Sequence, residues 1–134
     1  MTAYAYPARI EQTEALTGDN TFEEAYALAE DCLICALGFY TDPRCPRPIP
    51  EPSPPQPGEH LIELPPLVVA KLALHSAMRE KEVTDTDLAA QLGVTEAVVR
   101  RLLDLDHRSH IGQVEKALAL LGKRLVVEVR DIAA

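Results

Sequence analysis

The sequence predicts an α+β protein with two lobes joined by a proline-rich strap. Three observations carry this prediction: an alternating segment followed by a helical one, eight prolines within residues 41–58, and two short helical patterns around a glycine in residues 84–103. The predicted organisation is an α/β lobe over residues 1–40, the strap over 41–58, a strand over 59–64 that completes the first sheet, and a helix-turn-helix lobe over 65–134 that ends in a strand.

The first lobe opens with a strand pattern, because Tyr4, Tyr6, Ala8 and Ile10 alternate with other residues. Pro7 places that strand at a sheet edge. Thr21 to Glu24 then have the form of a capping box that begins a helix. The apolar positions at helical spacing in that helix, which we expect to face the core, are Phe22, Ala25, Ala29, Cys32, Leu33, Ala36 and Phe39.

The eight prolines of residues 41–58 exclude both a helix and a central strand. The composition predicts an extended tract of polyproline II character. We expect it to act as a stiff strap across the protein's own surface. A ligand for a proline-recognising domain is the alternative.

Residues 84–103 have the spacing of a helix-turn-helix. The small Ala89 allows the two helices to cross closely, and Gly93 can adopt the positive φ that a sharp turn needs. Thr84 and Thr95 stand where side-chain oxygens cap the two helices, with Asp87 three residues after Thr84. The residues expected to pack inside this unit are Leu88, Leu92, Val94, Val99 and Leu102.

One face of the second helix is then free to contact a ligand. The residues that we predict to contact base edges of DNA are Thr95, Glu96, Ala97, Arg100 and Arg101, with Ser109 and His110 near phosphate. The alternative is a three-helix packing unit whose arginines are only solvated. Five neighbouring acidic residues oppose DNA binding because they repel phosphate: Asp85, Asp87, Glu96, Asp104 and Asp106.

Helices also flank this motif. Pro65 and Pro66 start one that runs from about Leu67 to Glu80, and Ser109 is the predicted cap of another that ends at Gly122. The expected inward positions of the latter are Ile111, Val114, Ala117, Leu118 and Leu121. Residues 124–129 form a terminal strand, which we expect to pair with the same strand of a second copy in a homodimer or higher even oligomer.

Charge is distributed unevenly along the chain. Residues 1–65 contain 3 basic and 11 acidic residues, whereas residues 66–134 contain 10 of each. This asymmetry favours an acidic lobe for a basic partner and a neutral lobe that tolerates DNA, although a merely soluble acidic surface explains the charge equally well. The start of the chain has neither a basic leader nor a long apolar segment, so we expect a cytoplasmic protein without membrane contact.

The sequence gives no reason to expect an enzyme, a metal or a cofactor. Cys32, Cys35 and Cys45 with His60 can be written as a zinc site, but the first two lie on the helical apolar stripe, which favours core packing. Residues 107–110, His-Arg-Ser-His, look like an acid–base dyad of His107 and His110. They lie in a connection before a helix, however, where Ser109 as a cap and the basic residues as phosphate contacts or solvated charges explain them.

Several motifs in order resemble one known family. They are the leading Tyr-Pro strand, residues 16–25 (Leu-Thr-Gly-Asp-Asn-Thr-Phe-Glu-Glu-Ala), residues 48–53 (Pro-Ile-Pro-Glu-Pro-Ser), the helix-turn-helix and the terminal strand. Together they resemble the HicB-family antitoxins of bacterial toxin–antitoxin pairs. The resemblance implies that the first lobe is a partial RNase H-like sheet and helix that binds a HicA-type toxin, a small RNA-cutting protein. It also implies that the second lobe binds the operon's own promoter.

The chain departs from the family at one place. Members usually carry a second strand between the first strand and the helix, and the nine residues 12–20 are too few for it. The resulting expectation is a non-enzymatic antitoxin that neutralises its toxin and represses its own operon. The alternative is a stand-alone dimeric helix-turn-helix repressor whose first lobe binds an effector or another protein.

Overall fold

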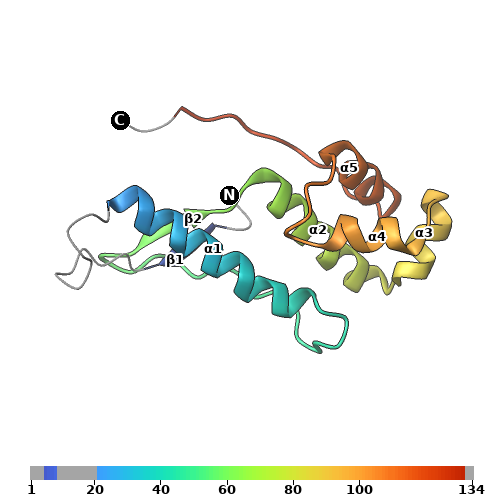
Figure 1. The fold of residues 1–134 in the computed structure, drawn as a ribbon, viewed down its shortest axis with the longest axis horizontal. Coiled ribbons are helices and arrows are strands. Elements are labelled where there is room, and N and C mark those ends of the chain that lie inside the picture. The colour runs from blue at the N-terminus through green and yellow to red at the C-terminus, as the bar shows by residue number, and fades with distance from the viewer. Residues whose placement is uncertain (1–4, 9–20, 132–134) are drawn as a thin grey trace. The chain divides into compact units, whose positions relative to one another are not determined.

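A computed structural model describes residues 5–8 and 21–131 of the chain (Figure 1). Its elements are β1 (Ala5–Ala8), α1 (Phe22–Thr41), β2 (His60–Glu63), α2 (Pro66–Lys81), α3 (Asp85–Leu92), α4 (Glu96–Leu103) and α5 (Ile111–Leu120). This mixture of helices and short strands confirms the α+β class. The chain divides into two compact units, residues 1–69 and residues 70–134.

The first unit is built on an antiparallel pair of strands. β1 pairs with β2 so that Tyr6 lies opposite Ile62, and the Ile62 side chain is fully buried. α1 is joined to β2 by side-chain contacts: the Tyr26 hydroxyl accepts a hydrogen bond from the backbone N–H of Glu63 at 2.9 Å. The ring of Phe22 also meets His60 edge-on, with 4.9 Å between ring centres. The predicted strand and helix of this unit are therefore present, while residues 9–20, where the family's second strand is expected, lie outside the described part.

The buried face of α1 differs from the predicted one. Leu37 is its buried residue, whereas Cys32 and Cys35 are exposed and Phe39 keeps 73% of its surface exposed. The core-packing prediction for Cys32, Ala36 and Phe39 is therefore wrong. Apolar residues surround this 20-residue helix on more than one side, so periodicity alone did not indicate which side β2 covers.

Residues 42–58 contain neither helix nor strand, as predicted, whereas Thr41, predicted to belong to this segment, is the last residue of α1. Glu59, predicted to begin the next strand, lies just before β2. The proline-rich segment is held to the first unit by the Tyr6 hydroxyl, which donates a hydrogen bond to the Pro50 carbonyl oxygen at 2.7 Å. This hydrogen bond to β1 agrees with the prediction that the segment runs along the protein's own surface.

The second unit is a helical core. Its fully or nearly fully buried apolar residues are Ala70, Leu72, Leu74, Ala77, Met78, Leu88, Ala89, Val99, Leu102, Leu105, Val114, Ala117, Leu118 and Leu121. Four of the five inward positions predicted for α5 are among them, and the fifth, Ile111, is 39% exposed. α5 ends at Leu120, and the predicted terminator Gly122 follows it with a φ of 76°, which lets the N–H of Lys123 return to the carbonyl of Leu118 at 2.9 Å.

The predicted terminal strand is not formed within this single chain. Residues 123–131 have no helix or strand, and Figure 1 shows them leaving α5 as an extended trace. Val126, Val127 and Val129 are 77%, 64% and 92% exposed. A strand needs a partner for its backbone hydrogen bonds, and the described part of the chain supplies none.

Candidate nucleic-acid and protein interfaces

The turn between α3 and α4 is stabilised by side-chain caps at both helix starts. The Thr84 hydroxyl accepts from the N–H of Asp87, and the Asp87 carboxylate accepts from the N–H of Thr84, both at 3.1 Å. This confirms the predicted capping box, and the two hydrogen bonds to Thr84 hold the pKa of Asp87 below its usual value of 3.8. Thr95 caps α4 in the same manner, with its hydroxyl 3.4 Å from the N–H of Val98.

Gly93 makes the sharp bend between the two helices. It has φ 70° and ψ 33°, the left-handed conformation that glycine adopts without strain. Ala89, Val99 and Leu102 are buried where the two helices pack, as predicted. Val94 differs, because 38% of its surface is exposed.

The predicted contact face of α4 lies at the surface. Its exposed residues are Thr95, Glu96, Ala97, Arg100 and Arg101. Two of them also serve the motif itself: Thr95 is the cap, and the Glu96 carboxylate accepts from the Thr86 hydroxyl at 2.8 Å. Arg101 donates weakly to the Ala97 carbonyl at 3.4 Å. The two guanidinium groups are thus the exposed cationic groups of a helix whose opposite face is buried.

Ser109 has a different role from the predicted cap of α5. The N-cap of α5 is His110, which makes no side-chain capping bond. The Ser109 hydroxyl instead donates to the Arg101 carbonyl at 3.2 Å and lies 3.0 Å from Lys71 Nζ. Ser109 is partly buried whereas His110 is exposed, so the structure separates the two residues that were predicted to lie together near phosphate.

Lys71 is the buried residue that sequence reasoning missed. Its surface is 0% exposed, and its ammonium donates to the carbonyls of Asp104 and His107 at 2.6 Å and of Arg101 at 3.0 Å. A single charged residue in the apolar run from Val68 to Leu72 was the available signal. Burial lowers the pKa of Lys71, an effect that the carboxylates of Asp104 and Asp106 oppose.

His75 reinforces the same region from one turn further along α2. Its Nε2 lies 2.7 Å from the carbonyl oxygen of Leu103, so Nε2 carries the proton and donates. Burial lowers the pKa of His75, which therefore favours the neutral ring. Lys71 and His75 together supply donors to carbonyls at the C-terminal end of α4, which no backbone partner within the helix can satisfy completely.

The closeness of His107, Ser109 and Lys71 does not make a nucleophile. His107 Nδ1 lies 3.0 Å from the Ser109 hydroxyl, but the hydroxyl proton is directed to the Arg101 carbonyl. A base would have to accept that proton, whereas Lys71 already donates to several oxygens. The cluster is arranged to hold backbone rather than to attack a substrate.

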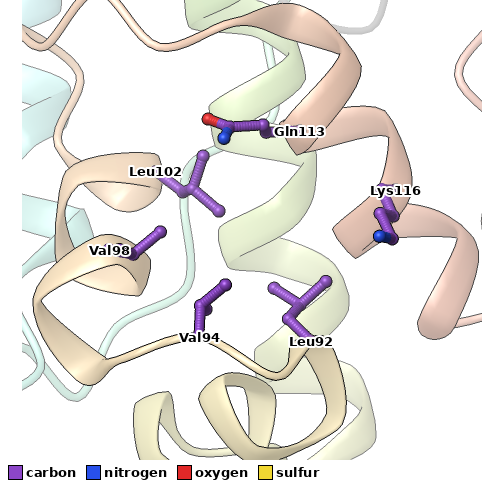
Figure 2. Close-up of a pocket in the computed structure, with 6 residues that line it drawn as sticks. All are labelled: Leu92, Val94, Val98, Leu102, Gln113 and Lys116. Atoms are coloured by element: carbon purple, nitrogen blue, oxygen red, sulfur yellow. The ribbon is translucent and has the colours of Figure 1, made fainter.

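A shallow apolar depression lies beside the turn in the same unit. Figure 2 shows its lining of Leu92, Val94, Val98, Leu102, Gln113 and Lys116, which come from the end of α3, the turn, α4 and α5. Its volume is about 90 Å³, too small for more than a few atoms of a ligand. Val94 contributes to this hollow instead of the core, which explains its exposure.

The first unit presents an apolar strip to solvent. The outer face of α1, which we define as Leu28, Cys32, Cys35 and Phe39, follows helical spacing and is exposed along its length. Glu24 and Asp31 fall beside it on the same helix. Within residues 5–8 and 21–131, no group of three or more His, Cys, Asp or Glu side chains is placed to hold a metal ion.

Comparisons with known proteins place the chain in a family. Residues 6–73 match the family model described as the HicB-like antitoxin of bacterial toxin–antitoxin systems. Antitoxin HicB 2 of Photorhabdus laumondii subsp. laumondii is 39% identical over 112 residues, which cover 84% of this chain and 78% of that protein. Antitoxin HicB of Escherichia coli strain K12 is 38% identical over 112 residues, covering 84% of this chain and 80% of that protein.

The chain therefore belongs to the HicB-like antitoxin family, and the resemblance seen in the sequence is confirmed. Its relatives are antitoxins, a regulatory class that acts on a toxin partner. The family match ends at residue 73 and so lies mostly over the first unit, leaving the α3–α4 motif to be judged on its geometry. Among the helices described, none combines the length and the apolar character that crossing a membrane demands.

Proposed function

We propose that this antitoxin represses its own operon by placing α4 in the major groove of operator DNA. The observation that carries the proposal is the exposed pair Arg100 and Arg101 on a capped helix whose other face is buried. Guanidinium groups on such a helix are suited to guanine edges and phosphates. We assign base-edge contact to Thr95, Glu96, Ala97, Arg100 and Arg101, and phosphate contact to His110, with Ser109 close behind the surface.

The test removes both arginines. We expect Arg100→Ala with Arg101→Ala to weaken binding to the promoter fragment of the protein's own operon by about 2 to 5 kcal/mol in a gel-shift titration at fixed salt. Arg79→Ala with Lys81→Ala is the matched control, because it removes the same charge from exposed residues at the end of α2. Equal affinities for both double variants would refute the assignment.

We further propose that the first unit neutralises a HicA-type ribonuclease toxin. Support comes from its charge, since residues 1–65 have a net charge of −8, and from the outer face of α1. An apolar strip with Leu28 and Phe39 exposed to 60% and 73% is unusual on a protein surface unless a partner covers it. Its acidic neighbours Glu24 and Asp31 suit a basic, RNA-binding partner.

Co-expression with the adjoining reading frame tests this second part. We expect a small basic protein to co-purify with the chain, and Leu28→Ser with Phe39→Ser to weaken that complex by at least about thirtyfold, because two apolar anchors are lost. Ala27→Ser, an exposed change off the strip, is the control and should leave the complex intact. Undiminished capture by the double variant would show that the toxin binds elsewhere.

A stand-alone dimeric repressor is the second candidate function. The exposed valines of residues 124–129 favour self-association, which a repressor needs with or without a toxin. The two candidates differ in the operon: a neighbouring frame whose product binds the chain supports the antitoxin, and its absence supports the stand-alone repressor. Because both functions act on DNA, we propose that the protein is cytoplasmic.

A further inference from the structure

We propose that Lys71 is a positioning residue that shapes residues 104–110, which we call the α4–α5 connection, so that its exposed side chains His107, Arg108 and His110 meet the DNA backbone. The inference rests on the proposed DNA binding and adds a residue that does not touch DNA. Lys71 is completely buried, while His107, Arg108 and His110 of the connection are exposed.

The hydrogen bonds show how one ammonium organises the connection. It has three N–H donors and four acceptors within 3.0 Å: the carbonyls of Arg101, Asp104 and His107 and the hydroxyl of Ser109. The two contacts at 2.6 Å are to Asp104 and His107, three residues apart, so the backbone between them curves around the ammonium. Between these two residues the Leu105 side chain is buried in the core and the Asp106 side chain is exposed, so the connection is anchored from below while His107, Arg108 and His110 stay at the surface.

The contact to Arg101 links this arrangement to the proposed recognition helix. The Arg101 carbonyl lies in the last turn of α4, where the partial negative charge of the helix end favours a cation. Ser109 donates to the same carbonyl, which ties the far end of the connection to the helix that carries Arg100 and Arg101. One buried side chain thus fixes the connection and the end of α4 together.

The buried charge also offsets an unfavourable feature of the sequence. Asp104 and Asp106 are exposed carboxylates in the connection and repel phosphate. Among the residues described here, no carboxylate forms an ion pair with Lys71, so its charge is balanced by carbonyl dipoles and remains available to counter the field of these two acids. Without Lys71, the connection would carry the same acids with no cation fixed beneath it.

A double-mutant cycle separates this role from direct phosphate contact by Ser109. We expect Lys71→Met, which keeps the apolar stem, to lower promoter affinity at least tenfold and to reduce the slope of log affinity against log salt by about one phosphate contact. Ser109→Ala should lower affinity in the wild-type background and have little effect in the Lys71→Met background. Additive losses would overturn the inference, because they indicate that Ser109 binds DNA independently.

Leu72→Val is the matched control for general destabilisation, since it trims a buried residue next to Lys71 that makes no side-chain hydrogen bond. We expect it to lower thermal stability and leave the salt slope unchanged. If Lys71→Met does not fold, Lys71→Gln, which keeps two N–H donors but no charge, carries the test: a lowered promoter affinity supports the inference, and wild-type affinity overturns it.

The two proposals fail in different ways. If the Arg100→Ala, Arg101→Ala variant loses promoter binding while folded Lys71→Met keeps wild-type binding, only the role of Lys71 is overturned. Wild-type binding by both variants overturns the proposed DNA contact itself.

Discussion

Individual side chains of α2 stabilise the second unit by donating hydrogen bonds to backbone carbonyls at the end of α4. Lys71 and His75 lie one helical turn apart on α2 and reach the carbonyls of Arg101 and Leu103. An unsatisfied buried carbonyl costs about 1 to 3 kcal/mol, so each donor matters even though a hydrogen bond contributes little net stability. The two donors differ in one respect, because the ordinary pKa of histidine is about 6.5 whereas that of lysine is about 10.4.

His75 predicts a pH dependence of stability. Burial lowers the pKa of His75 in the folded protein. The hydrogen bond to Leu103 and the charge of Asp85 oppose this effect, and the charge of Lys71 adds to it. The unfolded chain therefore binds more protons than the folded protein near pH 6.5. The free energy of unfolding should therefore fall as the pH drops from about 7.5 through 6.5. His75→Gln keeps an N–H donor but does not titrate, and urea denaturation should show a shallower fall for it. Parallel profiles for the two proteins would contradict this account.

At the scale of elements, the α3–turn–α4 unit is specified by short-range interactions. The Thr84–Asp87 capping box, the Gly93 bend and the Thr95 cap are each formed within a few residues. A helix of eight residues is marginal by itself, so these caps and the shared core under Ala89 and Val99 must act together.

Two glycine substitutions should have opposite effects on stability. A Cβ at Gly93 meets nothing within 4 Å, yet φ 70° strains any other residue, so Gly93→Ala should destabilise the protein by about 1 kcal/mol. Gly112 lies inside α5 with ordinary helical backbone and equal space, so Gly112→Ala should stabilise by a few tenths of a kcal/mol. Thermal melts of both variants check the signs, and a stabilising Gly93→Ala would mean that the bend is not fixed.

At the scale of the whole molecule, the chain has two units with different charge. Acidic residues predominate up to residue 65, and the charges balance beyond it. That division of charge agrees with the two proposed roles, in which the first unit binds a basic toxin and the second binds DNA. The terminal segment 123–131 extends from the second unit and has no strand partner in the described chain. Its valines are exposed.

Self-association through this segment can be tested by one backbone change. Val127→Pro removes an N–H and blocks strand pairing, so it should convert dimers to monomers and weaken promoter binding. Val127→Ala keeps the backbone donor and should remain dimeric, as measured by analytical ultracentrifugation. Since Val127 is 64% exposed in the single chain, neither change should lower the stability of the helical core. A dimeric proline variant would place the interface elsewhere.

Elements whose signals are local were predictable from the amino-acid sequence. Caps, glycine bends and proline runs act within a few residues. The boundaries of α2, α3 and α4 were therefore predicted closely, and residues 42–58 of the predicted strap 41–58 do lack regular structure. The exposed positions of Arg100 and Arg101 followed from the same helical periodicity. The family assignment also came from ordered sequence motifs.

The covered face of α1 and the contacts of Lys71 and Ser109 depend on long-range packing and became known only from the folded structure. Because α1 has apolar residues on several sides, the sequence did not indicate which side meets β2. Phe39 was therefore wrongly predicted to face the core. Lys71 reaches carbonyls thirty or more residues away, and Ser109, predicted to cap α5, is instead part of that cluster. Such contacts depend on how distant segments pack, because a buried charge is stable only where folding brings enough acceptors to it.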